Sequence, residues 1–195
     1  MRTDDRRHAR EQTQEATLDA AERLAGFEGV AGLSLKRLAE EAGLSTMIIY
    51  SHFGDRYGLE EALLRRAFRS LVGVVEETGS KGTSVTVVAE AIRMWSHAHP
   101  AQFSMVFAGA QSLDSGLQSL GRQLLADVAE LVRQQLGWAS SASGLALLAA
   151  LFGFLTVELR GQIDGDTAAT FGRLAESLQA LPLPRDNVKF VCGLG

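Results

Sequence analysis

Cysteine is almost absent from this chain, which has a single one, Cys192, among its 195 residues. One cysteine cannot form a disulfide within the chain, and this usage is typical of a reducing compartment. The first fifteen residues, MRTDDRRHAREQTQE, are charged throughout and lack an apolar stretch, so they predict no secretory signal peptide. We therefore expect a cytoplasmic protein.

Proline is also scarce and occurs only at Pro100, Pro182 and Pro184. Because proline interrupts helices and removes a backbone donor, its absence elsewhere leaves long helices unbroken. Apolar residues recur at helical spacing along most of the chain, whereas strand-like alternation is confined to SVTVV at 84–88, inside a helical pattern. The sequence thus predicts an all-α fold.

A long hydrophobic run is missing as well. The most apolar stretch, GLALLAALFGFLTV at 144–157, is shorter than the about 20 residues that a membrane span needs. A helix that is apolar on all sides is also typical of one buried between two partners in a soluble protein. We therefore predict no membrane segment.

Positive charge is not in excess, since 19 lysines and arginines stand against 23 aspartates and glutamates, for a net charge of −4. Proteins that bind nucleic acid often carry a basic excess, which this chain lacks. Residues 1–70 are also near neutral, with 11 basic and 12 acidic side chains. A DNA-binding surface would therefore depend on where individual charges are placed.

Short helical segments separated by glycine occupy the first seventy residues. Ser34 and Ser45 stand where a side-chain oxygen would cap a first helical turn, and Gly43 can supply the left-handed conformation that ends a helix. Two short helices joined by about three residues form a helix-turn-helix outline, which an ordinary helical hairpin would match equally well. The helices expected here are 11–27, 34–41, 45–52 and 55–78.

The chain changes character at the polar segment ETGSKGTS, 77–84, after which longer apolar helices follow. We predict an N-terminal domain at 1–70, a second domain at 71–182 and a C-terminal tail at 183–195. The further helices are expected at 83–98, 101–110, 115–137, 142–162 and 165–181.

A set of residues in LDAAERLAGFEGVAGLSLKRLAEEAGLSTMIIYSHFGDRYGLEEAL, 18–63, follows a known pattern. Its members are Ala20-Ala21, Gly29, Leu38-Ala39, Ala42-Gly43-Leu44-Ser45, Tyr50, His52-Phe53 and Leu59. The segment resembles the DNA-binding domain of the tetracycline-repressor (TetR) family of bacterial transcription regulators. The resemblance implies a homodimer whose N-terminal three-helix helix-turn-helix DNA-binding domain is joined to a C-terminal helical ligand-binding and dimerisation bundle. It also implies a palindromic double-stranded DNA operator and a small-molecule effector as partners.

Residues 45–52 form the expected recognition helix. At about 100° per residue, Ile49 and Phe53 share one face and can anchor the helix in a small core. Tyr50, His52 and Arg56 carry groups suited to phosphate oxygens, although each could equally be an ordinary surface or half-buried residue. The predicted DNA contacts are Ser34, Lys36, Ser45, Thr46, Met47, Ile48, Tyr50, Ser51, His52 and Arg56.

Three positions depart from the family pattern. Members commonly carry a small residue where this chain has Met47, often threonine where it has Ile48, and lysine where it has Arg56. Met47 and Ile48 can lie against thymine methyl groups. The operator sequence therefore does not follow from the resemblance.

The second half carries a weaker resemblance, in IRMWSHAHPAQFSMVFAGA at 92–110 and LFGFLTVELRGQ at 151–162, to a subgroup of TetR C-terminal domains. We expect an apolar effector pocket lined from 92–107 and 145–158, although for each side chain taken alone plain core packing is the favoured interpretation. Glu158 could be a polar anchor at the pocket, but a solvated helix end is the favoured interpretation. The candidate lining residues are Met94, Trp95, Phe103, Met105, Phe107, Phe152, Phe154 and Glu158.

His97 and His99 are two residues apart, so on a helix they point about 200° apart and cannot hold one ion. With no nucleophile–base set legible, we predict neither an enzyme nor a metal site, and no cofactor. The expected function is a ligand-responsive transcriptional repressor released by a small apolar effector. The alternatives are a helical-bundle enzyme or carrier, and a dimerisation module without DNA binding. Dimerisation is expected through 142–162 and 165–181.

Overall fold

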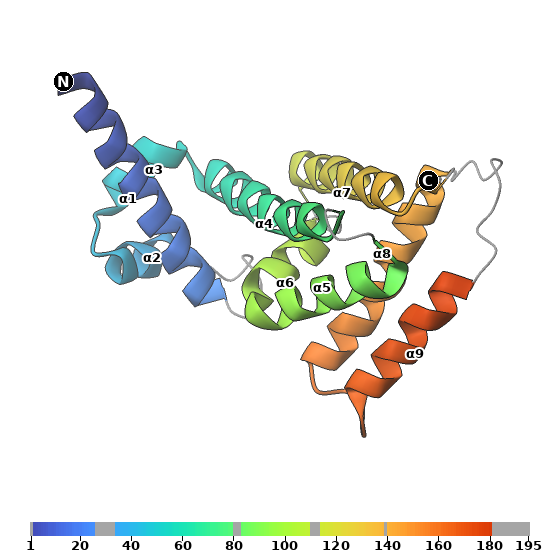
Figure 1. Ribbon diagram of the computed structural model, residues 1–195. Coiled ribbons are helices and arrows are strands. Elements are labelled where there is room, and N and C mark those ends of the chain that lie inside the picture. Colours follow the sequence, from blue (N-terminus) through green and yellow to red (C-terminus); the bar gives the residue numbers. More distant parts are fainter. Residues whose placement is uncertain (1, 26–33, 80–82, 110–113, 139, 181–195) are drawn as a thin grey trace. The chain divides into compact units, whose positions relative to one another are not determined.

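The computed structural model describes residues 2–25, 34–79, 83–109, 114–138 and 140–180. Every regular element within these ranges is an α-helix, as Figure 1 shows, so the all-α prediction is confirmed. The helices are α1 (Arg2–Ala25), α2 (Leu35–Ala42), α3 (Thr46–Phe53), α4 (Arg56–Gly79), α5 (Val85–Ala98), α6 (Pro100–Gly109), α7 (Ser115–Gln135), α8 (Ser141–Leu159) and α9 (Thr167–Ala180).

Local capping chemistry sets the ends of the short helices. The Ser34 hydroxyl oxygen accepts a hydrogen bond from the Arg37 amide at 3.5 Å, and that of Ser45 accepts one from the Ile48 amide at 3.3 Å. Gly43 ends α2 with a φ of 66°, a left-handed conformation that costs a glycine little. These predicted caps are confirmed.

The amino-terminal helix is longer than the sequence predicted, since α1 begins at Arg2 and not at residue 11. No glycine or proline interrupts it, and an ion pair between Arg7 Nε and Glu11 Oε1 at 2.9 Å supports its first turns. The starts of the other helices, and the ends of α2 to α9, lie within three residues of the predicted positions.

The described residues form two compact units. The first unit takes its residues from 1–67 and 99–121, and the second from 68–98 and 122–195. Helix α6 therefore belongs to the same unit as α1, against which it packs. The predicted domain boundary at residue 70 stays a prediction, and the predicted tail at 183–195 lies outside the described residues.

The core of the first unit forms where α1 packs against α2, α3 and α6. Leu59, Leu63 and Ala67 of α4 point inward, and so do small residues of α1 that allow close helix approach. Buried members of this core are Leu18, Ala20, Ala21, Leu38, Ala39, Ile49, Leu59, Leu63 and Ala67.

In the second unit, α5 packs against both α8 and α9, which also pack against each other. Helix α8 approaches α7 closely at Gly144, where an added Cβ would lie 2.1 Å from the Ala129 carbonyl oxygen. By length and composition 142–159 could span a membrane, with a mean hydropathy of 1.9, but a core helix of a soluble protein passes the same test. The absence of a membrane segment stays a prediction.

Candidate nucleic-acid interface

Helix α3 is held to the first unit by its inner face. Ile49 is buried, and the helix packs against both α1 and α2. Phe53, predicted to share this anchoring role, is half-buried at the last turn. The inward placement of Ile49 leaves the opposite side of this eight-residue helix facing outward.

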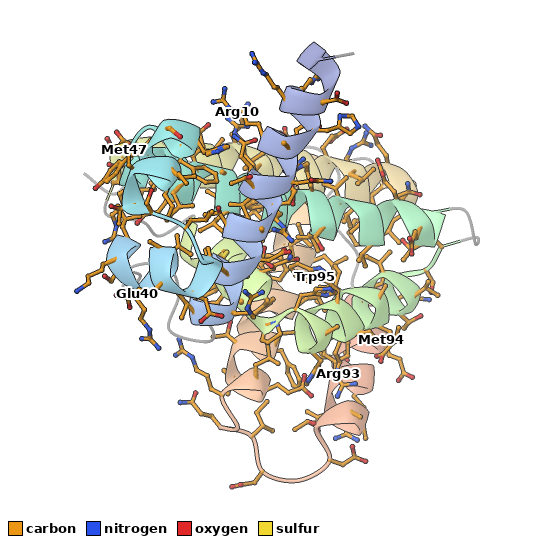
Figure 2. All side chains as sticks on the ribbon, turned by 90° about the vertical axis from the view of Figure 1, so that its left-hand side faces the viewer. Arg10, Glu40, Met47, Arg93, Met94 and Trp95 are labelled. Carbon is orange, nitrogen blue, oxygen red and sulfur yellow. The ribbon has the colours of Figure 1, made fainter. Side chains whose placement is uncertain are left out.

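That outer face carries large side chains that a surface helix normally avoids. Met47 is 79% exposed, Tyr50 48% and Ile48 37%, and Figure 2 shows Met47 at the periphery of the molecule. Thr46 and Ser51 are exposed beside them. A compact group of exposed apolar side chains rimmed by polar ones is typical of a surface that binds a partner.

The serines around α3 differ in what their hydroxyls can still do. Ser34 and Ser45 use their oxygens as helix caps, so their hydroxyl hydrogens can be donated to a phosphate oxygen. Ser51 donates its hydroxyl to the Ile48 carbonyl at 2.8 Å. Ser51 therefore retains acceptor capacity, which suits the amino group of a base.

His52 is the least accessible of the predicted contacts. Its ring is half-buried, and Nδ1 is buried without a hydrogen-bond partner among the described residues. Burial and, secondly, the positive charge of Arg10 lower the pKa of His52 below its ordinary value of 6.5. The imidazole is therefore neutral at pH 7 and can give one N–H to a phosphate.

The cations near α3 lie on α4, α2 and α1. Arg56 is the first residue of α4, and its Nε lies 2.7 Å from Glu60 Oε1, while the side chain stays about half exposed. Lys36 and Arg37 are exposed in the first turn of α2, and neither makes an ion pair with any residue that the structure describes. Positive side chains with little competition from carboxylates suit phosphate binding.

Two of these cations, Arg37 and Arg10, were not predicted from the sequence. Arg37 adjoins the predicted Lys36 and is also exposed. Arg10 donates from Nη2 to the Ser51 carbonyl at 3.4 Å, across 41 residues of sequence. The spacing of Arg10 and Gln14 by one helical turn was a signal for a shared face, but nothing in the sequence indicated that this face meets α3.

The predicted pocket residues divide between the two units. On α6, in the first unit, Phe103 and Met105 are buried and Phe107 is half-buried. The others lie on α5 and α8 in the second unit: Trp95, Phe152 and Glu158 are buried, Phe154 is half-buried and Met94 is exposed (Figure 2). A pocket lined by these residues stays a prediction.

Two aromatic residues of that set have specific partners within the second unit. Trp95 donates its indole N–H to the Ser70 hydroxyl oxygen at 2.8 Å. The ring of Phe154 lies 5.4 Å from that of Phe171 on α9, at an interplanar angle of 60°. Both contacts help to fix helices against one another.

The interpretation of Glu158 as a solvated helix end is wrong, because its side chain is only 3% exposed. Its carboxylate accepts a hydrogen bond from Arg93 Nη2 at 2.8 Å and lies 3.2 Å from His97 Nε2. Burial alone would raise the pKa of Glu158, but hydrogen bonds from Arg93, Thr167 and His97 lower it below 4.5. The carboxylate therefore joins α8 to α5 in its ionised form.

A capped helix-turn-helix whose second helix has an exposed outer face is the arrangement that small helical DNA-binding proteins place in the major groove. Residues 18–63 match the model of bacterial regulatory proteins of the tetR family, and residues 85–178 match the tetracyclin repressor-like C-terminal domain. The chain belongs to the TetR family, a family of regulatory proteins and not of enzymes.

Curated relatives match over part of their length. The HTH-type transcriptional regulator Rv1816 of Mycobacterium tuberculosis is 29% identical over 108 residues, which are 52% of this chain and 46% of the relative. Mb1846 of Mycobacterium bovis matches with the same values. The matched segment thus spans about half the length of these relatives.

Solved structures match over nearly the whole chain. The regulatory protein SCO4313 has a TM-score of 0.70 at 23% identity, covering 88% of this chain and 97% of that one. The multidrug binding protein EbrR, solved with imidazole, has a TM-score of 0.68 at 21% identity, covering 89% and 93%. At this level of identity the likeness shows a shared fold.

Proposed function

We propose that this chain is a cytoplasmic, one-component transcriptional repressor that binds a palindromic operator as a homodimer and is released by a small apolar effector. The observation that carries the proposal is the outer face of α3, where Met47, Ile48 and Tyr50 are exposed on a helix capped by Ser45. Membership of a family of bacterial regulators supports it.

The DNA contacts divide into two kinds. Met47 and Ile48 lie against thymine methyl groups and read sequence, while Thr46 and Ser51 bond to base edges or backbone. The side chains assigned to phosphates fix the register of the helix in the major groove without reading sequence. They are Ser34, Lys36, Ser45, Tyr50, His52 and Arg56.

Dimerisation is proposed through α8 and α9. Ala146, Ala149, Gly153 and Val157 are exposed along one side of α8, at spacings of three and four residues. Small residues at this spacing allow close antiparallel packing of helices against a second copy. On α9, Ala168 and Ala169 are also exposed.

The dimer is tested with Ala149→Arg combined with Gly153→Arg. Both residues are exposed, and no atom lies within 4 Å of a Cβ added at Gly153, so a single subunit tolerates the changes. We expect a monomer in sedimentation velocity, whereas Ala126→Arg at an exposed site on α7 stays dimeric. A soluble, fully dimeric double variant would refute the assignment.

The effector is proposed to bind in the C-terminal helical domain at residues 92–98 and 145–158, which belong to the same unit. The apolar and aromatic side chains of these segments support an apolar ligand. EbrR, whose fold is similar, is a multidrug binding protein. To shift the protein from 99:1 to 1:99 between its DNA-binding and released states, the effector must prefer the released state by about 5.5 kcal/mol.

The DNA-binding proposal is tested by titrating the protein against the DNA that flanks its own gene and against random duplex at several salt concentrations. Arg56→Ala should weaken binding to both and reduce the salt slope by about one unit per half-site. Ile48→Ala should leave the slope unchanged and reduce discrimination at one or two base pairs by about 1 kcal/mol. The reverse pattern would refute the assigned roles, and absence of binding to either DNA would refute the function.

A further inference from the structure

The amino-terminal part of α1 is attached to the recognition helix. Arg10 Nη2 donates to the Ser51 carbonyl and Gln14 Nε2 donates to the His52 carbonyl, each at 3.4 Å. Helix α1 begins at Arg2, well before the family match starts at residue 18. Residues 2–17 of α1 therefore precede the family match, and two of them contact the C-terminal end of α3; Figure 2 shows Arg10 on this part of α1.

This extension is basic on the side that meets α3. At about 100° per residue, Gln14 lies about 40° from Arg10, Arg6 lies about 40° on the other side, and Arg7 lies within about 60°. All three arginines are exposed. Arg7 is paired with Glu11, whereas Arg6 makes no ion pair with any residue in the described part of the chain.

Three acidic residues of α1 face away from Arg10. Asp5, Glu15 and Asp19 lie about 140° or more around the helix from Arg10. Arg66 of α4 bonds to Asp19 and lies 3.4 Å from Glu15 Oε2, so its positive charge partly offsets these two carboxylates. Glu15 and Asp19 of α1 thus turn toward α4, whereas Arg10 turns toward α3.

The electrostatics at the C-terminal end of α3 give a further reason why an arginine there favours DNA binding. The C-terminal end of a helix carries a partial negative charge on its free carbonyls, which would repel a nearby phosphate. Arg10 binds one of those carbonyls, that of Ser51, and its guanidinium has five N–H donors, so others remain available. Arg10 thereby converts a repulsive end of the recognition helix into an attractive one.

We propose that Arg6, Arg7 and Arg10 form a further DNA-binding face on α1, which holds the phosphodiester backbone of the duplex next to the site read by α3. The inference rests on the proposed DNA-binding function and extends its surface beyond α2, α3 and the start of α4. Arg6 and Arg10 are about 6 Å apart along the helix, so they can reach different phosphates of one strand. Continuity with the recognition helix and charge complementarity both favour DNA as the occupant.

The test uses the full chain with a short random-sequence duplex and with the fragment flanking its own gene. Arg6→Gln should lower the slope of log affinity against log salt by about 0.9 per half-site on both DNAs. At 0.15 M salt that corresponds to about fivefold weaker binding per half-site, with the ratio between the two DNAs unchanged. Arg10→Gln should act in the same direction.

Two controls isolate the effect. Arg122→Gln removes the same charge from an exposed position on α7 in the second unit, and should leave the slope at the wild-type value. Arg6→Lys keeps the charge and should retain the slope. Circular dichroism checks that each variant keeps its helix content.

The outcomes separate this inference from the function on which it rests. If wild type binds both DNAs and Arg6→Gln and Arg10→Gln keep its salt slope, the face on α1 is overturned while DNA binding stands. A change in the ratio between the two DNAs without a change in slope would assign these arginines to base reading and also overturn the inference. If wild type binds neither duplex, both proposals fail.

Discussion

Replacing Glu158 with leucine removes the carboxylate that joins α5 and α8, and we expect the free energy of unfolding to fall by about 3 kcal/mol. The Glu158 side chain is 3% exposed and that of Arg93 is 17% exposed. Arg93 donates to Oε1 from Nη2 at 2.8 Å and approaches both carboxylate oxygens from Nε at 3.2 Å. Binding of one guanidinium to both oxygens of a carboxylate is the strongest form of an arginine–carboxylate ion pair.

The size of the effect follows from what the variant leaves behind. Removing one partner of a buried ion pair costs about 3–5 kcal/mol, because the other charge stays buried without compensation. Arg93 keeps Glu90, whose oxygen lies 3.5 Å away but is largely exposed, and it keeps its position over the Phe171 ring. Because these contacts remain, we expect the loss of stability to be about 3 kcal/mol, at the lower end of that range. This loss changes the unfolding equilibrium constant by more than a hundredfold.

Urea unfolding followed by circular dichroism at pH 7 measures this loss. Glu176→Leu, at an exposed position on α9, serves as the control and should change stability by less than about 0.5 kcal/mol. Arg93→Leu combined with Glu158→Leu should be more stable than Glu158→Leu alone, since no uncompensated charge remains. The reasoning would be refuted if the free energy of unfolding of Glu158→Leu lay within 1 kcal/mol of the wild-type value, or if the double variant were less stable than Glu158→Leu.

The same carboxylate gives a stability that depends on pH. Because the folded pKa of Glu158 lies below 4.5, its contribution is fully present above pH 4.5 and is lost as the pH falls through the folded pKa. The stability difference between wild type and Glu158→Leu should therefore be constant from pH 7 to about 5 and narrow below pH 4.5. A difference that widened on acidification would contradict the assigned pairing.

Two further substitutions test the packing and the capping. Gly144→Ala should lower stability by about 1–3 kcal/mol in thermal unfolding, because its Cβ would lie 2.1 Å from the Ala129 carbonyl oxygen, whereas Gly73→Ala, with nothing within 4 Å, should not destabilise. Ser45→Ala removes the cap of α3 and should cost about 1 kcal/mol in urea unfolding; stability equal to wild type would count against the capping bond.

Local chemistry made much of the fold predictable from the sequence. Ser34, Gly43 and Ser45 fix helix ends through bonds to residues three or four positions away, so their roles are legible without knowledge of the rest of the chain. The predicted start of α1 at residue 11 was wrong because no such local signal marks the true start at Arg2. A helix with neither a cap nor a breaker continues as far as side-chain pairs such as Arg7–Glu11 support it, and periodicity of apolar residues does not report this.

Periodicity alone placed Ile49 inward on α3 and left Met47 outside. Long-range polar contacts, in contrast, were not predictable from the sequence. The bond from Arg10 to Ser51 spans 41 residues and that from Arg93 to Glu158 spans 65, and each depends on how helices pack. Glu158 was misread because an acidic residue at the end of an apolar helix is usually solvated, unless a cation from another helix reaches it.

Residues 1–70 are near neutral and can still present a positive face to DNA, because their charges are not equivalent. Arg66 is shared among Glu15, Asp19 and Glu22 of α1, and Glu22 also accepts hydrogen bonds from Gln102 on α6. Carboxylates held in such a network are partly neutralised, so they oppose a phosphate less than free ones do. Lys36, Arg37 and Arg6 are exposed and make no ion pair with the described residues, so no described carboxylate directly offsets their charge. The net charge of residues 1–70 therefore says little about DNA binding, since the partners of each charge decide the local field.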